Sequence, residues 1–260
     1  MVLSRLFRKS HFPPPATPPA LPEGLRVYAI GDVHGRLDCL DALLEMIAQD
    51  SADATAETRL VFLGDLIDRG PESRGVVERA MQLAAGPRAC EFVKGNHEEM
   101  LLQAAAGEPG AVSLFRRAGG RETLLSYGAD AGELDACDME ALVALIGRLV
   151  PEEHLAFLES FGNGVTLGDY RFVHAGVRPG IAFEEQKETD LRWIRHEFLN
   201  HEGHFDGVIV HGHTISEEPE LRHNRIGIDT GAFFTGRLTA LVLEGTGQRT
   251  IEARGPAGDY

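Results

Sequence analysis

The sequence predicts an α/β fold in which parallel strands alternate with helices. Three times in succession, a short apolar run ends at a polar loop that contains glycine, and a helical segment follows. This alternation is typical of a parallel sheet covered by helices. Ligands of such folds bind at the carboxyl ends of the strands. We therefore expect the three polar loops to meet at one edge of the sheet and to form the functional site.

The first unit has a predicted strand at residues 25–30, followed by the loop Gly31-Asp32-Val33-His34-Gly35. A helix is predicted at residues 37–48, where apolar side chains recur every three or four positions. An aspartate and a histidine thus stand between a strand and a helix, at the end of the strand where a bound group is expected.

The second unit has a strand at residues 59–63, the loop Gly64-Asp65-Leu66-Ile67-Asp68-Arg69-Gly70 and a helix at residues 73–84. Two carboxylates this close repel each other unless cations lie beside them. The guanidinium of the loop would face an anion held by those cations. The loop therefore predicts a metal site that handles phosphate, although Asp and Gly after a strand also form ordinary turns.

The third unit has a strand at residues 91–94, the loop Gly95-Asn96-His97-Glu98 and a helix at residues 99–105. The chain stays mostly helical to about residue 161 and carries no chemical motif there. We interpret residues 99–161 as a helical insertion that flanks or partly covers the site. Its arginines could reach a substrate, but a solvated helix face is the favoured interpretation. They are Arg116, Arg117 and Arg121.

Strands return in the second half of the chain. A strand at residues 164–167 precedes one at 170–173 that ends in His174-Ala175-Gly176, and a strand at 207–210 ends in His211-Gly212-His213-Thr214. We predict three last strands that form a mostly antiparallel sheet. Their ranges are 225–228, 238–243 and 249–253, and Asp229-Thr230-Gly231 stands between the first two.

Composition limits the function classes. The net charge of −15 and pI of about 5.1 disfavour binding to nucleic acid or to an anionic membrane. No apolar run is long enough to span a bilayer. The cysteines Cys39, Cys90 and Cys137 are few and widely spaced, so we expect neither disulfides nor a structural zinc site. A reducing compartment, and hence a cytoplasmic location, is expected.

We expect residues 1–23 to form a disordered or polyproline-like tail, because they are basic and proline-rich and contain no signal-peptide core. The sequence names no partner for this tail. Residues 24–260 are predicted to form one catalytic domain, because the motif residues extend from Asp32 to His213 and must meet across the fold.

The strand-end residues together form a metal-ligand set of carboxylates, imidazoles and one amide oxygen. The set is Asp32, His34, Asp65, Asn96, His174 and His213. Mixed oxygen and nitrogen ligands suit Mn, Fe or Zn, with Mn preferred here, better than Ca or Mg. The set exceeds the needs of one ion, so we infer two divalent ions that share a carboxylate. Such a pair clamps phosphate for in-line attack and converts a bridging water into a hydroxide nucleophile.

In combination and order, these motifs resemble the metallophosphoesterases of the PPP phosphatase family, within the calcineurin-like phosphoesterase superfamily. The similarity covers about residues 27–243, and the compact bacterial and phage serine/threonine protein phosphatases are the most similar members. The resemblance implies a sandwich of two mixed β-sheets flanked by helices, with the helical insertion attached.

The resemblance also implies a role for each matching position. Asp32 and His34 would hold the first metal and Asp65 would bridge both. The second metal would be held by Asn96, His174 and His213. His97 would be the general acid and Asp68 would orient it. Arg69 and Arg195 would bind the phosphate. His213 is preferred over His211 as the ligand, because a threonine follows it.

The implied function is a metal-dependent phosphomonoesterase that acts on phosphoserine, phosphothreonine and also phosphotyrosine in proteins, or on small phosphoesters. The alternative is a hydrolase of dinucleoside polyphosphates such as diadenosine tetraphosphate. Many of those enzymes carry Gln in place of His34, which favours the protein phosphatase. A catalytically silent metal-bound scaffold is a third hypothesis, disfavoured by the intact motif residues.

Two smaller expectations remain. The turn Asp229-Thr230-Gly231 is expected to support the site. The histidines outside any motif are expected on the surface; they are His154, His196, His201, His204 and His223.

Overall fold

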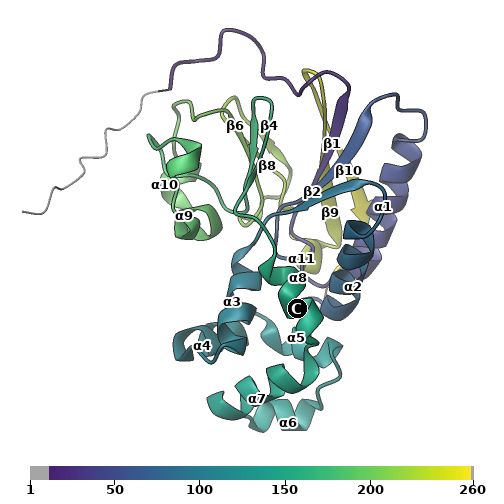
Figure 1. Cartoon of the computed structure of the whole chain (residues 1–260), viewed down its shortest axis with the longest axis vertical. Coiled ribbons are helices and arrows are strands. Elements are labelled where there is room, and N and C mark those ends of the chain that lie inside the picture. Colours follow the sequence, from purple (N-terminus) through teal and green to yellow (C-terminus); the bar gives the residue numbers. More distant parts are fainter. Residues whose placement is uncertain (1–11, 259–260) are drawn as a thin grey trace, which may run out of the picture.

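Two five-stranded β-sheets pack face to face and carry helices on their outer faces (Figure 1). The computed structural model describes residues 12–258 of the chain. The predicted fold class, a sandwich of two mixed sheets with flanking helices, is confirmed.

The first sheet has the strand order β10-β9-β1-β2-β3. Its strands are β1 (Leu25–Ile30), β2 (Glu57–Phe62), β3 (Ala89–Phe92), β9 (Arg237–Glu244) and β10 (Gly247–Arg254). The strands β1, β2 and β3 are parallel, as the three strand-loop-helix units predict, whereas β9 and β10 are antiparallel to their neighbours. The carboxyl ends of the three parallel strands therefore lie at one edge.

The second sheet has the order β4-β5-β6-β8-β7. Its strands are β4 (Val165–Leu167), β5 (Tyr170–Phe172), β6 (Val208–His211), β7 (Glu220–Leu221) and β8 (Arg225–Gly227). The central strands β5, β6 and β8 are parallel, and both edge strands are antiparallel.

The expectation that the last three strands form one mostly antiparallel sheet is right for β9 and β10, which form an antiparallel pair, but wrong for β8. β8 lies in the second sheet, parallel to β6, while β9 and β10 lie in the first. The connection from β8 to β9 contains the short helix α11 (Ala232–Thr235) instead of a tight hairpin turn, so the chain crosses from one sheet to the other. An apolar run does not by itself specify its pairing partner.

Helices cover the outside of each sheet and form the insertion. On the first sheet lie α1 (Leu37–Asp50) and α2 (Ser73–Ala84), and on the second lie the 3₁₀ turn η1 (Phe183–Glu185), α9 (Glu188–Trp193) and α10 (His196–Leu199). The insertion comprises α3 (Asn96–Ala105), α4 (Pro109–Arg117), α5 (Gly120–Ser126), α6 (Ala131–Ala136), α7 (Met139–Leu149) and α8 (Glu152–Glu159). It extends beyond one end of the sandwich (Figure 1).

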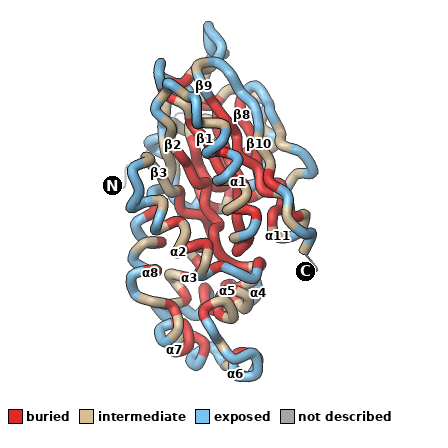
Figure 2. Tube along the Cα trace, turned by 90° about the vertical axis from the view of Figure 1, so that its right-hand side faces the viewer, coloured by how far each residue is buried: buried red, intermediate tan, exposed pale blue. Residues whose placement is uncertain are grey.

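Strand periodicity divides the core into layers. In β1, Val27 and Ala29 pack between the sheets, while Tyr28 and Ile30 face the helical side with α1. Successive side chains of a strand point to opposite faces, so a central strand buried on both sides reads as a continuous apolar run. The buried part of the chain runs through the strands into the insertion (Figure 2).

The segment predicted to be a disordered tail is partly ordered. Residues 1–11 lie outside the described residues. From Phe12 onward the segment follows the second sheet: the Ala20 amide donates to Asp169 Oδ2 (2.9 Å), and Leu21 is buried between the sheets. Its prolines indicated an extended chain, but composition alone does not reveal that one leucine fills a gap in the core. No helix in the described residues is long and apolar enough to cross a membrane.

Candidate functional site

All six predicted metal ligands converge at the carboxyl ends of β1, β2, β5 and β6 and at the first turn of α3. Each is at most 7% exposed; they are Asp32, His34, Asp65, Asn96, His174 and His213. The third predicted loop is shorter than expected, because α3 begins at Asn96 and not at residue 99. Asn96 and His97 therefore lie in the first turn of a helix, which fixes their backbone more firmly than a loop would.

The backbone of the site adopts an unusual conformation. Among the described non-glycine residues, positive φ occurs only at His34, Asp65, Asp68, Arg69 and His213. All of them are predicted site residues. Such conformations are uncommon for L-residues and collect at functional sites, where the surrounding structure holds them. Gly64 also has a positive φ, of 97°, which favours glycine. In addition, a Cβ at this position would lie 2.6 Å from the Gly95 nitrogen, so no other residue fits there.

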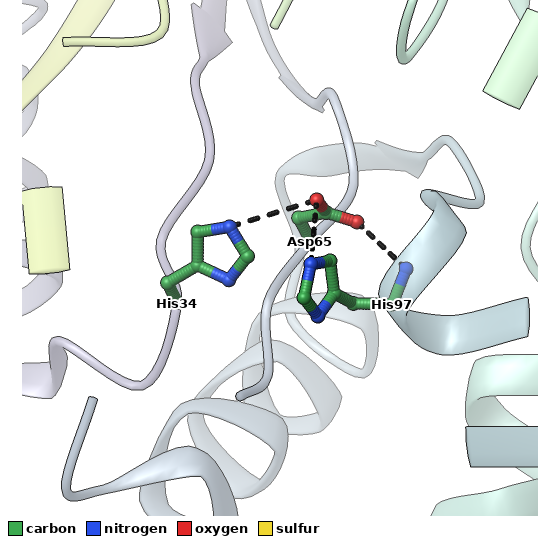
Figure 3. Close-up of side chains that lie close together, drawn as sticks. All are labelled: His34, Asp65 and His97. Carbon is green, nitrogen blue, oxygen red and sulfur yellow. Dashed lines mark hydrogen bonds and ion pairs between the residues drawn. The ribbon is translucent and has the colours of Figure 1, made fainter. Parts of the chain in front are cut away.

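The first half of the cluster joins the first two loops to α3 (Figure 3). His34 Nε2 lies 3.6 Å and His97 Nε2 lies 3.8 Å from Asp65 Oδ2. The amide of His97 donates to Asp65 Oδ1 (3.0 Å), so the carboxylate is anchored on one oxygen and faces the imidazoles with the other. These side chains form a group that could hold a metal ion.

The second half joins Asp65 to the second sheet. His174 Nε2 lies 3.3 Å from Asp65 Oδ2, 2.9 Å from Asn96 Oδ1 and 3.1 Å from His213 Nδ1. Asp65, His174 and His213 form a second group suited to a metal ion. Asp65 is the only residue common to both groups in the described chain, which is the position that the sequence analysis gave to the bridging carboxylate.

Asp32 lies beside the second half. Both of its carboxylate oxygens accept the backbone amide of His213, at 3.2 and 3.0 Å. Asp32 belongs to neither of the two close groups. The group that contains His34 and Asp65 has His97 as its third member, where the sequence analysis expected Asp32. The structure thus brings Asp32 into the site but places its carboxylate next to the loop of β6.

Backbone carbonyls orient two of the imidazoles. His34 Nδ1 lies 2.7 Å from the Ile67 oxygen, and His174 Nδ1 lies 2.8 Å from the Leu63 oxygen. A carbonyl only accepts, so Nδ1 must carry the proton in both rings. Nε2 is therefore the nitrogen that faces the cluster in both rings, and a metal ion would bind there in place of a proton.

Glu98 positions the loop after β2, a role that the sequence analysis did not assign. It is fully buried and accepts the amides of Asp65 (2.8 Å), Leu66 (2.7 Å) and Gly95 (2.9 Å). A glutamate at the third position of a helix commonly bonds back to the cap residue. The sequence Gly95-Asn96-His97-Glu98 indicates the bond from Glu98 back to Gly95. It does not indicate the bonds to Asp65 and Leu66, which lie more than thirty residues earlier.

His97 and Asp68 form a buried pair next to the cluster. His97 Nδ1 lies 2.6 Å from Asp68 Oδ2, and the hydroxyl of Thr123 in α5 donates to Asp68 Oδ1 (2.5 Å). Burial lowers the pKa of His97, but the carboxylates of Asp65 and Asp68 outweigh burial and raise it above its usual value. The pair thus favours a protonated imidazole.

Both predicted phosphate-binding arginines reach the cluster. Arg69 Nη2 lies 3.1 Å from His97 Nε2, and its guanidinium lies 4.7 Å from the ring centre of Phe233. Arg195 Nε donates to His213 Nε2 (3.0 Å). Because the arginines approach opposite halves of the cluster, an anion bound there would meet a guanidinium on each side.

The charges of the site fit divalent cations. Burial opposes ionisation of Asp65, but His174 and His97 hold its pKa well below the usual value. Burial and the nearby carboxylate of Asp229 raise the pKa of Asp32 well above its usual value. Buried carboxylates that repel one another beside imidazole lone pairs are a donor set suited to two such ions. The proximity of Asp229 agrees with the expected supporting turn.

The histidines outside any motif differ in burial. His196 and His223 are exposed, and His201 and His204 are half-buried. The surface position expected for His154 is wrong, because this residue is buried and its Nδ1 lies 2.9 Å from the hydroxyl of Tyr127. His154 lies on α8, and Tyr127, the residue that follows α5, offers it a buried partner. His211 is buried but belongs to neither close group, and its ring contacts Phe198 of α10.

Comparisons with known proteins agree with this geometry. The family model described as calcineurin-like phosphoesterase matches residues 25–232. Bis(5′-nucleosyl)-tetraphosphatase PrpE (asymmetrical) of Bacillus cereus is 27% identical over 82% of this chain and 88% of its own length. The structure is similar to a putative diadenosine tetraphosphatase (TM-score 0.62, 20% identity, 96% and 100% of the two chains). It is also similar to a cold-active protein tyrosine phosphatase of Shewanella (TM-score 0.53, 18% identity, 95% and 84%). The chain belongs to the calcineurin-like phosphoesterase family.

Proposed function

We propose that this phosphoesterase hydrolyses dinucleoside polyphosphates such as diadenosine tetraphosphate. The observation that supports phosphoester chemistry is the shared carboxylate Asp65 between two groups of imidazoles, with the pair His97 and Asp68 beside it. The observation that supports the dinucleotide is the similarity to the nucleosyl tetraphosphatase over most of both chains.

We assign the metal-ligand role to the six predicted residues: Asp32, His34, Asp65, Asn96, His174 and His213. Two divalent ions, Mn, Fe or Zn, would neutralise phosphate oxygens there and lower the pKa of a bound water. The protein orients its ligands beforehand, because carbonyls of the strand-end loops fix His34 and His174.

His97 is assigned as the general acid. Its Nδ1 proton stays on the bond to Asp68, and Nε2 gives a proton to the oxygen that leaves phosphorus. Asp68 stabilises the charged ring and fixes its orientation, while Thr123 fixes Asp68. A positioned acid of this kind contributes about 10²–10⁴-fold to the rate.

Arg69 and Arg195 are assigned to phosphate binding. Both guanidiniums lie at hydrogen-bond distance from histidines of the cluster, so a phosphate beside those histidines is within their reach. Arginine presents a planar set of donors that matches two oxygens of one phosphoryl group. They would neutralise charge on the non-bridging oxygens as the bond breaks.

A serine/threonine protein phosphatase with some activity on phosphotyrosine is the second candidate. The observation that favours it is His34, at a position where many dinucleotide hydrolases carry glutamine. The ring lies in the cluster with its Nε2 facing Asp65, so it supplies a nitrogen ligand where glutamine would not. Both candidate functions use the same cluster. Their substrates differ in the groups that are attached to the phosphorus atom under attack.

The test is a side-by-side assay of the metal-stripped protein after addition of Mn²⁺. We expect diadenosine tetraphosphate to be cleaved to ATP and AMP with a kcat/KM well above that for phosphate release from a phosphoserine peptide. A peptide preference would replace the proposed substrate by the second candidate. Hydrolysis of neither substrate, with metal bound, would contradict the enzymatic function.

A further inference from the structure

A cavity of about 980 Å³ lies next to the cluster on the outer face of the second sheet. His211 lines it together with residues of β8, the segment after α10 and the loop after β6. We call it the His211 cavity. Its wall includes Thr214, the residue after His213, and consecutive Cα atoms are about 3.8 Å apart. The cluster and the wall of this cavity therefore meet at two neighbouring residues, His213 and Thr214.

The wall of the His211 cavity contains buried polar groups that the protein leaves unpaired. Thr214 Oγ1, Asn224 Oδ1 and Arg225 Nε are buried and have no hydrogen-bond partner in the described part of the chain. Their residues line one cavity, and the three atoms lie just beneath its surface. Buried polar groups normally have partners, so their concentration in this wall points to a polar ligand.

Two arginines and two glutamates carry the formal charges of the cavity wall: Arg222, Arg225, Glu202 and Glu220. Arg225 is buried, with its side chain 3% exposed, and Arg222 lies at the surface, with 54% exposed. They share Glu220, whose oxygens lie 2.7 Å from Arg225 Nη1 and 3.3 Å from Arg222 Nη2. One carboxylate thus pairs with two guanidiniums, and the longer of the two contacts is the one to the exposed Arg222. An incoming phosphate could bind Arg222 without breaking the inner pair.

We propose that the His211 cavity binds the nucleotide portion of the substrate that lies beyond the scissile phosphate. This inference rests on the proposed dinucleotide hydrolase activity. The volume is at the upper end of the range for small-molecule sites, about 300–1,000 Å³, and so accommodates a nucleotide. Arg222 would meet its phosphates and Ile215 would cover an apolar face of the base.

The first experiment measures ATP binding to the full-length protein by calorimetry in EDTA, where the probe is not hydrolysed, with circular dichroism to verify folding. Arg222→Glu reverses a charge at the cavity edge and is expected to weaken binding about tenfold. Glu220→Gln removes the negative charge that competes with the phosphates and is expected to strengthen binding about threefold. General destabilisation cannot produce effects of opposite sign.

Arg74→Glu is the matched control, because Arg74 is similarly exposed (52%) and also pairs with one glutamate, Glu78 at 2.8 Å, but on α2. Wild-type affinity in this control, with opposite shifts in the two cavity variants, would support the proposal. No ATP binding by the wild type, equal shifts in Arg222→Glu and Arg74→Glu, or shifts of one sign in both cavity variants would overturn it.

The second experiment compares kcat/KM for diadenosine tetraphosphate with that for p-nitrophenyl phosphate, which has no second nucleotide. In Arg222→Glu the ratio of the two values is expected to fall about tenfold. An unchanged ratio in an active dinucleotide hydrolase would overturn the cavity assignment alone. Absence of dinucleotide cleavage by the wild type, with ATP binding and its variant pattern intact, would reject the proposed function while supporting the cavity as a nucleotide site.

Discussion

The loop after β2 and the helical insertion serve the same site in different ways. The loop carries the groups assigned to chemistry, Asp65, Asp68 and Arg69, within five residues. The insertion holds that loop from outside: Thr123 pairs with Asp68, and the Gly119 carbonyl accepts the amide of Arg69 (3.2 Å). The reactive groups thus follow a strand end in a recognisable motif, whereas Thr123 and Gly119, which hold them from outside, lie in a segment with no motif.

The largest expected effect comes from Asp65, the residue common to both halves of the cluster. Asp65→Asn keeps the size but removes the charge that faces three imidazoles. We expect metal content to fall from two ions per chain and kcat for p-nitrophenyl phosphate to drop more than about 10³-fold. Elemental analysis and the assay measure both. Asp41→Asn, in an exposed pair with Arg79, is the control. Full metal content in Asp65→Asn would refute the bridging role.

His97 separates acid catalysis from metal binding. His97→Ala is expected to retain both ions but lose about 10²–10⁴-fold in kcat, because the leaving oxygen no longer receives a proton. The loss should be smaller for p-nitrophenyl phosphate, whose leaving group is less basic, than for an alkyl phosphate. Turnover equal to wild type would remove His97 from the mechanism, and loss of metal would make it a ligand.

Thr123 tests whether the insertion contributes to catalysis. Thr123→Val preserves shape but removes the hydroxyl that donates to Asp68 Oδ1 and accepts the Asp68 amide. We expect kcat to fall about tenfold to a hundredfold with KM and metal content unchanged, because Asp68 would hold His97 less firmly. Steady-state kinetics of the purified variant measure this.

A double-mutant cycle distinguishes positioning from simple loss of stability. If Thr123 acts through His97, Thr123→Val should have little further effect on kcat in the His97→Ala background. Ser126→Ala, which removes another hydroxyl of α5 that bonds to the Thr123 carbonyl, is the control and should leave kcat near wild type. Equal additive losses in both backgrounds would make Thr123 purely structural.

The two regions also differ in how far the sequence predicts them. The three strand-loop-helix units and the loops with Asp65 and His97 could be predicted, because short-range periodicity and motif spacing encode them. The contact between Thr123 and Asp68, 55 positions apart, could not, since nothing near Thr123 distinguishes it from a core threonine. The crossing of the chain between β8 and β9 and the burial of Leu21 likewise depend on tertiary packing.

The smallest expected effect concerns Arg121, two residues before Thr123 in α5. Residues two positions apart on a helix do not share a face, and here Thr123 is buried against Asp68 while Arg121 pairs with the exposed Asp135 (3.0 Å). Exposed pairs contribute little, so Arg121→Ala should change stability by less than about 0.5 kcal/mol and leave kcat/KM unaltered. Chemical denaturation and the dinucleotide assay measure both. A loss of kcat/KM would show that the insertion reaches the substrate as well as the loop. Wild-type kinetics would confine its contribution to the face that carries Thr123.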